Sequence, residues 1–340
     1  MKILVTGGAG FIGSAFVRIA ADQGMDIVLC DKMTYAADLL RVESAKNRIS
    51  TYTVDISDAD AMESIFAKET PEAVLHFAAE THVDRSIMNP DEFVRTNVTG
   101  TTTLLRLSRK FRTKRFVHIS TDEVYGDLPA DTDLKFLETD PIMPNSPYAA
   151  SKAAADMFVR SYIKTFDHPA LIVRPSNNYG PWQYPEKLIP LTIAKTMLNE
   201  KIPVYGKGDN VRTWLYVDDC ADGIFKLLQN GNPGEIYNIG SHEERRNIDV
   251  INSILELMNG DRGLIEFVPD RPGHDFRYAV HTEKISSATG WTSSTSFEEG
   301  LSKTVKWYVD HKDWLLKKKS DVEGFVMALM SEYSKEGDKS

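Results

Sequence analysis

The sequence predicts an α/β fold, with a doubly wound parallel sheet in the first half and a smaller mixed lobe in the second. Short apolar runs alternate with helical patterns as far as Ile119, a glycine-rich loop follows the first run, and polar side chains follow several others. Such alternation favours a right-handed parallel sheet with helices on both faces. We expect residues 1–175 to form the sheet domain. Residues 176–320 would form mainly the smaller lobe, with some segments returning to the first, and 321–340 an extra amphipathic helix and tail.

Composition narrows the class of protein. The 340 residues carry a net charge of −9, which argues against a nucleic-acid-binding surface. Cys30 and Cys220 are the only cysteines, too few for a disulfide framework, and this favours a reducing, cytoplasmic location. The N-terminus has no signal-peptide pattern, and no run of 18 apolar residues occurs, so we expect no membrane span. The scattered histidines predict no metal site.

The first strand, Lys2–Thr6, precedes the loop GGAGFIG at Gly7–Gly13 and a helical pattern from Ser14 to about Ala21. Strand, glycine loop and helix form the context of a dinucleotide-binding fingerprint. Small residues such as Gly7, Gly10 and Gly13 let the backbone approach a pyrophosphate, and the helix N-terminus supplies amide donors. The sequence therefore predicts a nicotinamide dinucleotide site of the Rossmann type.

The next strand, Asp26–Cys30, ends at Asp31 and Lys32. An acid about 20 residues past the loop is placed to accept hydrogen bonds from the adenosine ribose. Its charge would repel a 2′-phosphate, so NAD is favoured over NADP. The alternative is a surface acid at a strand end.

Two further strands end in polar or small residues. Ser50–Val54 ends at Asp55, which could face the adenine amino group, and Ala73–Phe77 ends at Ala78 and Ala79, which leave room for a cofactor. A helical pattern follows from about Asp91 to Lys110 and carries Thr96.

Two adjacent acids follow the strand Arg115–Ile119, in the stretch Thr121-Asp122-Glu123. Neighbouring carboxylates in one partly dry site push their pKa values apart, so one can donate a proton while the other accepts. The alternative is a solvated turn that caps a helix. The chemical interpretation gains weight only from the glycine loop and from the next motif.

Tyr148 and Lys152 open an alanine-rich helix. At a spacing of four residues they lie on one helix face. An ammonium beside a phenol favours the phenolate and is expected to lower the tyrosine pKa from about 10 toward neutrality. A tyrosinate is a suitable base for a sugar hydroxyl proton. The alternative is an ordinary surface pair.

Together these motifs resemble the extended short-chain dehydrogenase/reductases, and within them the dTDP-glucose 4,6-dehydratases, from Met1 to about Val309. The glycine loop and Tyr-x-x-x-Lys specify the superfamily, and Thr-Asp-Glu is the dehydratase feature. The stretches that carry the resemblance are GGAGFIG (7–13), DKMTYA (31–36), AAETHVDRSI (78–87), STDEVYGDL (120–128), SPYAASKAAAD (146–156), NNYGP (177–181), PEKLIP (185–190), RTWLYV (212–217) and DRPGH (270–274).

The resemblance implies a reaction with a tightly held NAD. Tyr148 would take the C4 hydroxyl proton during oxidation, with Thr121 on the C4 oxygen and Lys152 on the nicotinamide ribose. Glu123 would remove the C5 proton, and Asp122 would protonate the leaving C6 hydroxyl. Hydride would then return from NADH to C6 and a proton to C5, giving a 4-keto-6-deoxy sugar.

The resemblance also implies the binding residues. Those for the cofactor are Gly7, Gly10, Phe11, Ile12, Gly13, Asp31, Lys32, Thr34, Asp55, Ile56, Phe77, Ala78, Ala79, Thr96, Tyr148, Lys152 and Asn178. Those for the nucleotide sugar are Thr81, Thr121, Asn177, Lys187, Leu188, Pro203, Val204, Tyr205, Arg212, Asn247, Arg271 and His274. Arg212 and Arg271 could clamp a diphosphate, each through paired N–H groups. The alternative for each of these residues is a local salt bridge or a packed aromatic ring.

The second half is expected to contain a strand at 170–174 and helices at 247–259 and 297–309. Lys317-Lys318-Lys319 is interpreted as a solvated run. Apolar residues from Val322 to Tyr333 recur at helical spacing, which favours an amphipathic helix packed on its own subunit over a partner contact.

Three alternatives remain beside a dTDP-glucose 4,6-dehydratase. The substrate could be another nucleotide sugar, such as UDP-glucose or a UDP-N-acetyl sugar. A nucleotide-sugar 4-epimerase is disfavoured by Asp122 and Glu123. A non-catalytic NAD-binding regulator is disfavoured because Tyr148, Lys152, Asp122 and Glu123 are all intact. The resemblance also implies a homodimer in which the helices at 91–110 and 148–167 pair as a four-helix bundle.

Overall fold

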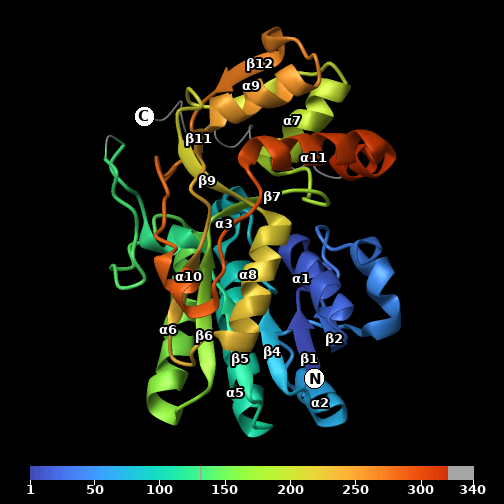
Figure 1. The fold of residues 1–340 in the computed structure, drawn as a ribbon, viewed down its shortest axis with the longest axis vertical. Coiled ribbons are helices and arrows are strands. Elements are labelled where there is room, and N and C mark those ends of the chain that lie inside the picture. The colour runs from blue at the N-terminus through green and yellow to red at the C-terminus, as the bar shows by residue number, and fades with distance from the viewer. Residues whose placement is uncertain (131, 321–340) are drawn as a thin grey trace.

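The computed structural model describes residues 1–130 and 132–320, and a seven-stranded sheet forms the core of its larger part (Figure 1). The strands are β1 (Lys2–Thr6), β2 (Asp26–Asp31), β3 (Ile49–Thr53), β4 (Ala73–His76), β5 (Arg115–Ile119), β6 (Ala170–Pro175) and β10 (Ile236–Ile239). Their order is β10-β6-β5-β4-β1-β2-β3, and every neighbouring pair is parallel. The predicted doubly wound parallel sheet is confirmed. Because strand order reverses between β1 and β4, a crevice is expected at their carboxyl ends.

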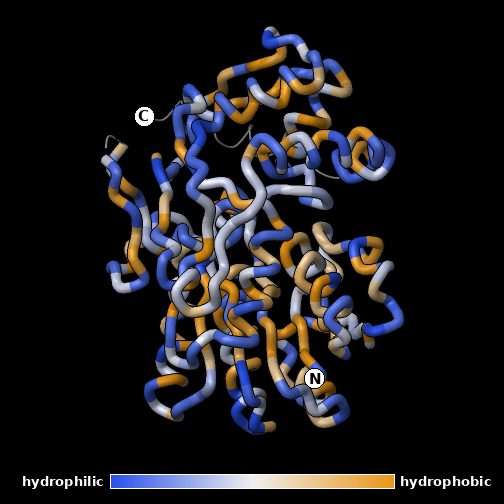
Figure 2. The backbone as a smooth tube through the Cα atoms, in the orientation of Figure 1, coloured by the Kyte–Doolittle hydropathy of each residue, from blue (hydrophilic) through white to orange (hydrophobic). Residues whose placement is uncertain are grey.

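Both faces of this sheet are buried, which explains why its strands are continuous apolar runs. Ile3 and Val5 belong to one hydrophobic cluster and Leu4 to another, because successive side chains of a strand point to opposite faces. All three are completely buried. The apolar tracks of the strands are visible in Figure 2.

Helices cover both faces. Those up to β10, together with the short 3₁₀ and π segments, are α1 (Phe11–Asp22), η1 (Leu39–Arg48), α2 (Ala59–Glu69), α3 (Val83–Met88), α4 (Pro90–Phe93), η2 (Val94–Gly100), α5 (Thr101–Lys110), η3 (Asp122–Tyr125), α6 (Pro147–Phe166) and α8 (Val217–Asn230). Helices α1 and α8 contribute to the cluster that contains Ile3, and α2, α5 and α6 to the cluster that contains Leu4. The single helix predicted near 91–110 is a run of α4, the π-helical η2 and α5.

The smaller part lies at the top of Figure 1 and packs helices against two small sheets. Its elements are β7 (Asn177–Tyr179), α7 (Leu188–Met197), β8 (Ile202–Tyr205), β9 (Val211–Tyr216), β11 (Glu244–Arg246), α9 (Asn247–Leu257), η4 (Arg262–Leu264), β12 (Ile265–Val268) and α11 (Phe297–Asp310). Ile193, Val250 and Leu301 belong to the hydrophobic cluster that joins α7, α9 and α11. The chain returns to the larger sheet through α8 and β10, and α10 (Glu283–Thr289) packs against both.

After α11, residues 312–320 form a further helical segment. The prediction that Lys317–Lys319 is solvated is wrong for Lys319, which is 4% exposed and pairs with Glu200 at 2.7 Å. Lys318 lies 3.5 Å from Asp38. The amphipathic helix predicted after Asp321 lies outside the described residues.

The described residues contain neither a candidate membrane span nor a candidate metal cluster. None of their helices combines the length and apolar character needed to cross a membrane. Within the same residues, no cluster of His, Cys, Asp and Glu side chains is arranged to hold a metal ion.

Candidate active site

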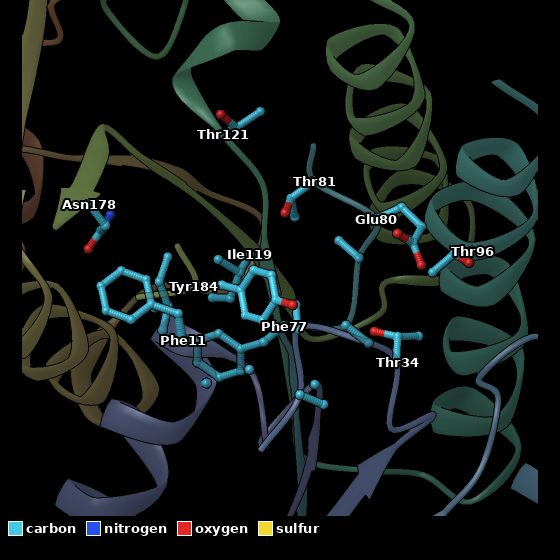
Figure 3. A pocket seen from close by; sticks show the side chains of 18 of the residues that line it. Phe11, Thr34, Phe77, Glu80, Thr81, Thr96, Ile119, Thr121, Asn178 and Tyr184 are labelled. Atoms are coloured by element: carbon cyan, nitrogen blue, oxygen red, sulfur yellow. The ribbon is translucent and has the colours of Figure 1, made fainter. Parts of the chain in front are cut away.

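A large cavity opens at the carboxyl ends of the central strands, where the sheet topology places a ligand crevice (Figure 3). It is lined by the glycine loop, by the segments that follow β2, β3, β4 and β5, and by the first turns of α6. All the residues predicted to bind the cofactor line it. So do Thr121, Asp122 and Glu123, together with Thr81, Asn177 and Lys187 from the predicted substrate set.

The glycine loop is tightly packed at two positions. Gly7 has φ +69°, and a Cβ atom there would lie 2.5 Å from the backbone N of Ala78. A Cβ atom at Gly13 would lie 2.3 Å from the carbonyl oxygen of Gly7. A side chain at either position would therefore displace the loop or the end of β4. With α1 beginning at Phe11, the loop presents backbone and a helix N-terminus to the cavity, as a dinucleotide pyrophosphate requires.

Asp31 ends β2 at one side of the cavity. Its two carboxylate oxygens accept hydrogen bonds from the backbone N–H groups of Ala9, at 3.0 Å, and Met33, at 2.9 Å. Burial raises the pKa of this carboxyl, and the two N–H groups oppose the shift. A carboxylate has about four lone-pair sites, so Asp31 retains capacity to accept ribose hydroxyls.

Other polar atoms of the lining are buried without a hydrogen-bond partner: Oγ1 of Thr96, Oδ1 of Asn177 and Oδ1 of Asn178. Buried polar groups are normally paired, so such atoms are suited to bind a ligand. The residues present therefore fit a bound dinucleotide.

Asp122 and Glu123 form the first turn of η3, directly after β5. The backbone N–H of Glu123 donates to Oγ1 of Thr121 at 3.3 Å, which fixes the turn. Asp122 is 2% exposed; burial, reinforced by the negative charge of Glu123, raises the pKa of Asp122 to about 8. Burial also raises the pKa of Glu123, opposed by the positive charges of Arg271, Lys187 and Arg212. Asp122 therefore holds a proton at neutral pH.

Tyr148 and Lys152 lie in the first two turns of α6. Ser146 caps this helix by accepting the backbone N–H of Ala149 at 3.1 Å. Both side chains are buried, and Nζ of Lys152 donates to the carbonyl oxygen of Ile119 at 2.6 Å, which ties α6 to the end of β5. Burial lowers the pKa of Lys152 to about 8.

The prediction of a lowered Tyr148 pKa is wrong for this structure. Burial, reinforced by the negative charge of Glu123, raises the pKa above its ordinary value, and a hydrogen bond with Thr121 only partly opposes the shift. The ammonium of Lys152 donates to Ile119 rather than to the phenol. A phenolate here needs a further positive charge.

A buried ionic group that the sequence reasoning did not identify lies behind Lys152. Oδ2 of Asp156 accepts from Nε of Arg174 at 2.9 Å, and Oδ1 lies 3.4 Å from Nε2 of His118. Asp156 is completely buried. Since Tyr148, Lys152 and Asp156 repeat every four residues on α6, the spacing could have placed Asp156 on the same face.

Eight predicted substrate residues lie outside this cavity lining: Leu188, Pro203, Val204, Tyr205, Arg212, Asn247, Arg271 and His274. Val204 is 3% exposed, packs with Ile202 and Ile251, and pairs with Phe267 of β12, so its side chain is not presented to a ligand. The rings of Tyr205 and His274 are 6.2 Å apart, edge to face.

The guanidinium of Arg212, expected to clamp a diphosphate, is already partly engaged by carbonyl groups of its own chain. The guanidinium is 5% exposed and donates to three carbonyl oxygens, those of Val211 (2.8 Å), Phe276 (3.0 Å) and Asp275 (2.8 Å). The positive charge of Arg212 still lowers the pKa values of Asp122 and Glu123, against the effect of burial. Arg271 is different, because its Nε is buried without a hydrogen-bond partner.

The cavity is also lined by residues that the sequence did not single out, among them Arg41, Glu80, Gln183, Tyr184 and Glu186. The side-chain amide of Asn97, in the π segment η2, makes two hydrogen bonds with the backbone of Glu80. Its Oδ1 accepts from the N–H of Glu80 at 2.9 Å, and its Nδ2 donates to the carbonyl oxygen at 3.0 Å. Nothing in the local pattern around Arg41 marks it as a cavity residue. Its position depends on contacts with distant segments.

Comparison with known proteins agrees with this geometry. The model of the family described as GDP-mannose 4,6 dehydratase matches residues 4–304. A dTDP-glucose 4,6-dehydratase of Shigella flexneri is 46% identical over 94% of this chain and 96% of its own. The crystal structure of the Bacillus anthracis dTDP-glucose 4,6-dehydratase with NAD has a TM-score of 0.87 at 41% identity, covering 94% of this chain and 99% of that one.

An epimerase structure is also similar. The UDP-glucose 4-epimerase of Thermus thermophilus, in complex with NAD, has a TM-score of 0.85 at 29% identity, covering 91% of this chain and 99% of that one. A shared scaffold therefore does not by itself separate the two activities. The extent of the family match does place the protein: the chain belongs to the GDP-mannose 4,6 dehydratase family.

Proposed function

We propose that the protein is an NAD-dependent nucleotide-sugar 4,6-dehydratase that converts dTDP-glucose to dTDP-4-keto-6-deoxyglucose, a hydro-lyase reaction. The observation that carries the proposal is the pair Asp122 and Glu123, which lies in one cavity with Tyr148. An elimination of water needs a base at one carbon and an acid at the leaving oxygen. Asp122, protonated at neutral pH, meets the second need.

NAD would be held by the glycine loop, by Asp31 and by the atoms of Thr96 and Asn178 that lack partners. When bound, NAD would accept a hydride and later return it, so no NADH would accumulate. Its nicotinamide would also bring positive charge to the cavity. That charge favours the phenolate of Tyr148, which burial and Glu123 otherwise disfavour.

The chain's own residues would divide the proton transfers. Tyr148 takes the proton of the C4 hydroxyl, and Thr121 hydrogen-bonds the C4 oxygen. The resulting C4 ketone acidifies the C5 proton, which Glu123 removes. Asp122 donates its proton to the C6 hydroxyl, which leaves as water. Lys152, fixed by Ile119, orients the ribose side of the nicotinamide.

For the substrate we propose contacts from Thr81, Asn177 and Lys187 in the cavity. Beyond it, the arginines near Glu123 and the pair Tyr205 and His274 would receive the nucleotide. The similar proteins of Shigella flexneri and Bacillus anthracis are both named dTDP-glucose 4,6-dehydratases, which supports dTDP-glucose as the substrate. A 4-epimerase has no use for an acid that is protonated at neutral pH beside a base, so Asp122 favours the dehydratase.

We also propose a homodimer formed through α6 and η2, which contact each other. Their outer surfaces carry Val94 (52% exposed), Met157 (42%) and Phe158 (42%), and such an exposed apolar group is typical of an interface. For the location we propose the cytoplasm, supported by the two buried cysteines, which form no disulfide.

The decisive experiment is incubation of the purified protein with dTDP-glucose, UDP-glucose and a UDP-N-acetyl sugar. We expect a 4-keto product from dTDP-glucose, recognised by its absorbance in alkali, without net formation of NADH. Net NADH, or recovery of only the C4 epimer, would contradict a dehydratase. A 4-keto product from a UDP-sugar alone would retain the reaction and replace the substrate.

A further inference from the structure

Two loops contribute to the wall of the cofactor cavity. The first follows β2 and contributes Lys32, Thr34 and Arg41, and the second follows β7 and contributes Gln183 and Tyr184. Movement of either loop away from the glycine loop would widen the cavity. What holds them in place therefore bears on cofactor release.

Arg41 ties the two loops to the glycine loop. It is 2% exposed, and its Nη1 donates to the carbonyl oxygens of Ala9 (2.7 Å) and Ala36 (2.6 Å), while Nη2 donates to that of Trp182 (2.9 Å). Three segments far apart in the sequence thus share one guanidinium. Hydrogen bonds to a charged group are stronger than neutral ones, so this junction is a stable one.

An aromatic group near the C-terminus covers the junction from outside. Nε1 of Trp314 donates to Oδ2 of Asp38 at 2.9 Å, and the guanidinium of Arg41 lies 5.8 Å from the centre of the Trp314 ring. The rings of Trp314 and Trp182 meet edge to face at 5.2 Å, and those of Trp182 and Trp307 lie at 4.6 Å. We call Trp182, Trp307 and Trp314 the tryptophan cluster.

Tyr308 on α11 adds a direct link to the second loop. Its hydroxyl, completely buried, donates to the carbonyl oxygen of Gln183 at 2.7 Å. Neither Tyr308 nor Trp314 lines the cavity, so both act through the loops. At the first loop, Asp38 also pairs with Lys318 at 3.5 Å.

We propose that Trp314 and Tyr308 are positioning residues for the cofactor: they hold the two wall loops and Arg41 against the glycine loop and so set the rate at which bound NAD dissociates. The proposal rests on NAD binding by this chain, which the proposed function includes. Opening the cavity breaks the Trp314–Asp38 hydrogen bond and separates the tryptophan cluster. Resident NAD, reduced and reoxidised in every turnover, needs such a slow exit.

The test compares Trp314→Ala and Trp314→Phe with Trp291→Phe. Trp291 is a buried tryptophan whose Nε1 also donates one hydrogen bond, to the carbonyl oxygen of Asp219 at 3.1 Å, and it does not line the cavity. Each protein is loaded with NAD and freed of excess by gel filtration. The dissociation rate is then followed with an excess of alcohol dehydrogenase and ethanol, which reduces every released NAD.

We expect Trp314→Ala to release NAD at least about tenfold faster than the wild type, as loss of one hydrogen bond to a charged group predicts. Trp314→Phe should be intermediate, Trp291→Phe should match the wild type, and added NAD should restore turnover to both Trp314 variants. Equal rates in all four proteins would overturn the proposal while leaving the proposed function intact. If Trp314→Ala does not fold, Asp38→Ala removes the acceptor of the same Trp314–Asp38 hydrogen bond, and its NAD release rate is compared with the wild type instead.

A wild-type protein that binds no NAD would instead overturn the proposed function, and this inference with it.

Discussion

Nε of Arg174 donates a hydrogen bond of 2.9 Å to Oδ2 of Asp156, and both side chains are shielded from water by the sheet and α6. Asp156 is the acid whose charge raises the pKa of Lys152 against the effect of burial. One buried carboxylate therefore balances two cations. This relationship connects the stability of the fold with the charge of a residue in the candidate site.

We predict that Asp156→Asn destabilises the protein by about 3–5 kcal/mol at pH 7, because it leaves the Arg174 charge buried without a partner. The pKa of Asp156 is lowered in the folded state, so its contribution is present above its unfolded pKa of about 3.9 and is lost as pH falls further. Urea unfolding at pH 7 and at about pH 3, below the unfolded pKa, measures both effects.

A matched control is Asp310→Asn, which removes an exposed pair with Lys306 at 2.6 Å. Exposed pairs contribute about 0–1 kcal/mol, so this variant should unfold nearly as the wild type does. Equal destabilisation by the two substitutions would show that Asp156 has no special role. Asp156→Asn should also lower the pKa of Lys152, because it removes the charge that raises it.

The pH dependence of water elimination should report Asp122. Its pKa of about 8 means that the protonated acid, present below that value, is lost as pH rises through it. Single-turnover formation of the 4-keto product should therefore decline above about pH 8, and Asp122→Asn should slow it by about 10²–10⁴-fold. A rate independent of pH between 6 and about 10 would contradict the assignment.

Substitutions of Tyr148 and of Glu123 should block the reaction at different steps. With Tyr148→Phe no base takes the C4 hydroxyl proton, so we expect no bound NADH when substrate is added. With Glu123→Gln oxidation proceeds and elimination stalls, so NADH should accumulate on the enzyme. Stopped-flow absorbance of NADH distinguishes the two. Full turnover by Glu123→Gln would remove Glu123 from the mechanism.

Sequence reasoning placed the residues whose positions follow from local geometry. The glycine loop, Asp31 and Thr121 come at or just after strand ends, and parallel strands bring their carboxyl ends to one edge. Tyr148 and Lys152 share a helix face through a four-residue spacing. Local rules of this kind predict one site for the glycine loop, Asp31, Tyr148 and Lys152, which do line a single cavity, whereas the full set of cofactor residues came from the family resemblance.

What could not be predicted depends on contacts between distant segments. Arg41 reaches the cavity through carbonyl groups of the glycine loop and of Trp182, which no local pattern connects to it. The resemblance predicts a diphosphate clamp at Arg212, but it does not reveal that this guanidinium also donates to carbonyl groups more than 60 residues away, at Asp275 and Phe276. The pKa of Tyr148 was misjudged because its direction is decided by burial, which a sequence does not reveal.

The proposed dimer gives the last prediction. Phe158 is 42% exposed on α6, and Phe267 is 60% exposed on β12 in the smaller part of the molecule. A charge forced into an apolar interface without a partner costs several kcal/mol, so Phe158→Glu should yield monomers. Phe267→Glu introduces the same charge outside the proposed interface and should leave the dimer intact. Light scattering distinguishes the 38.2 kDa chain from a particle of twice that mass. If Phe158→Glu remains dimeric, α6 does not form the interface.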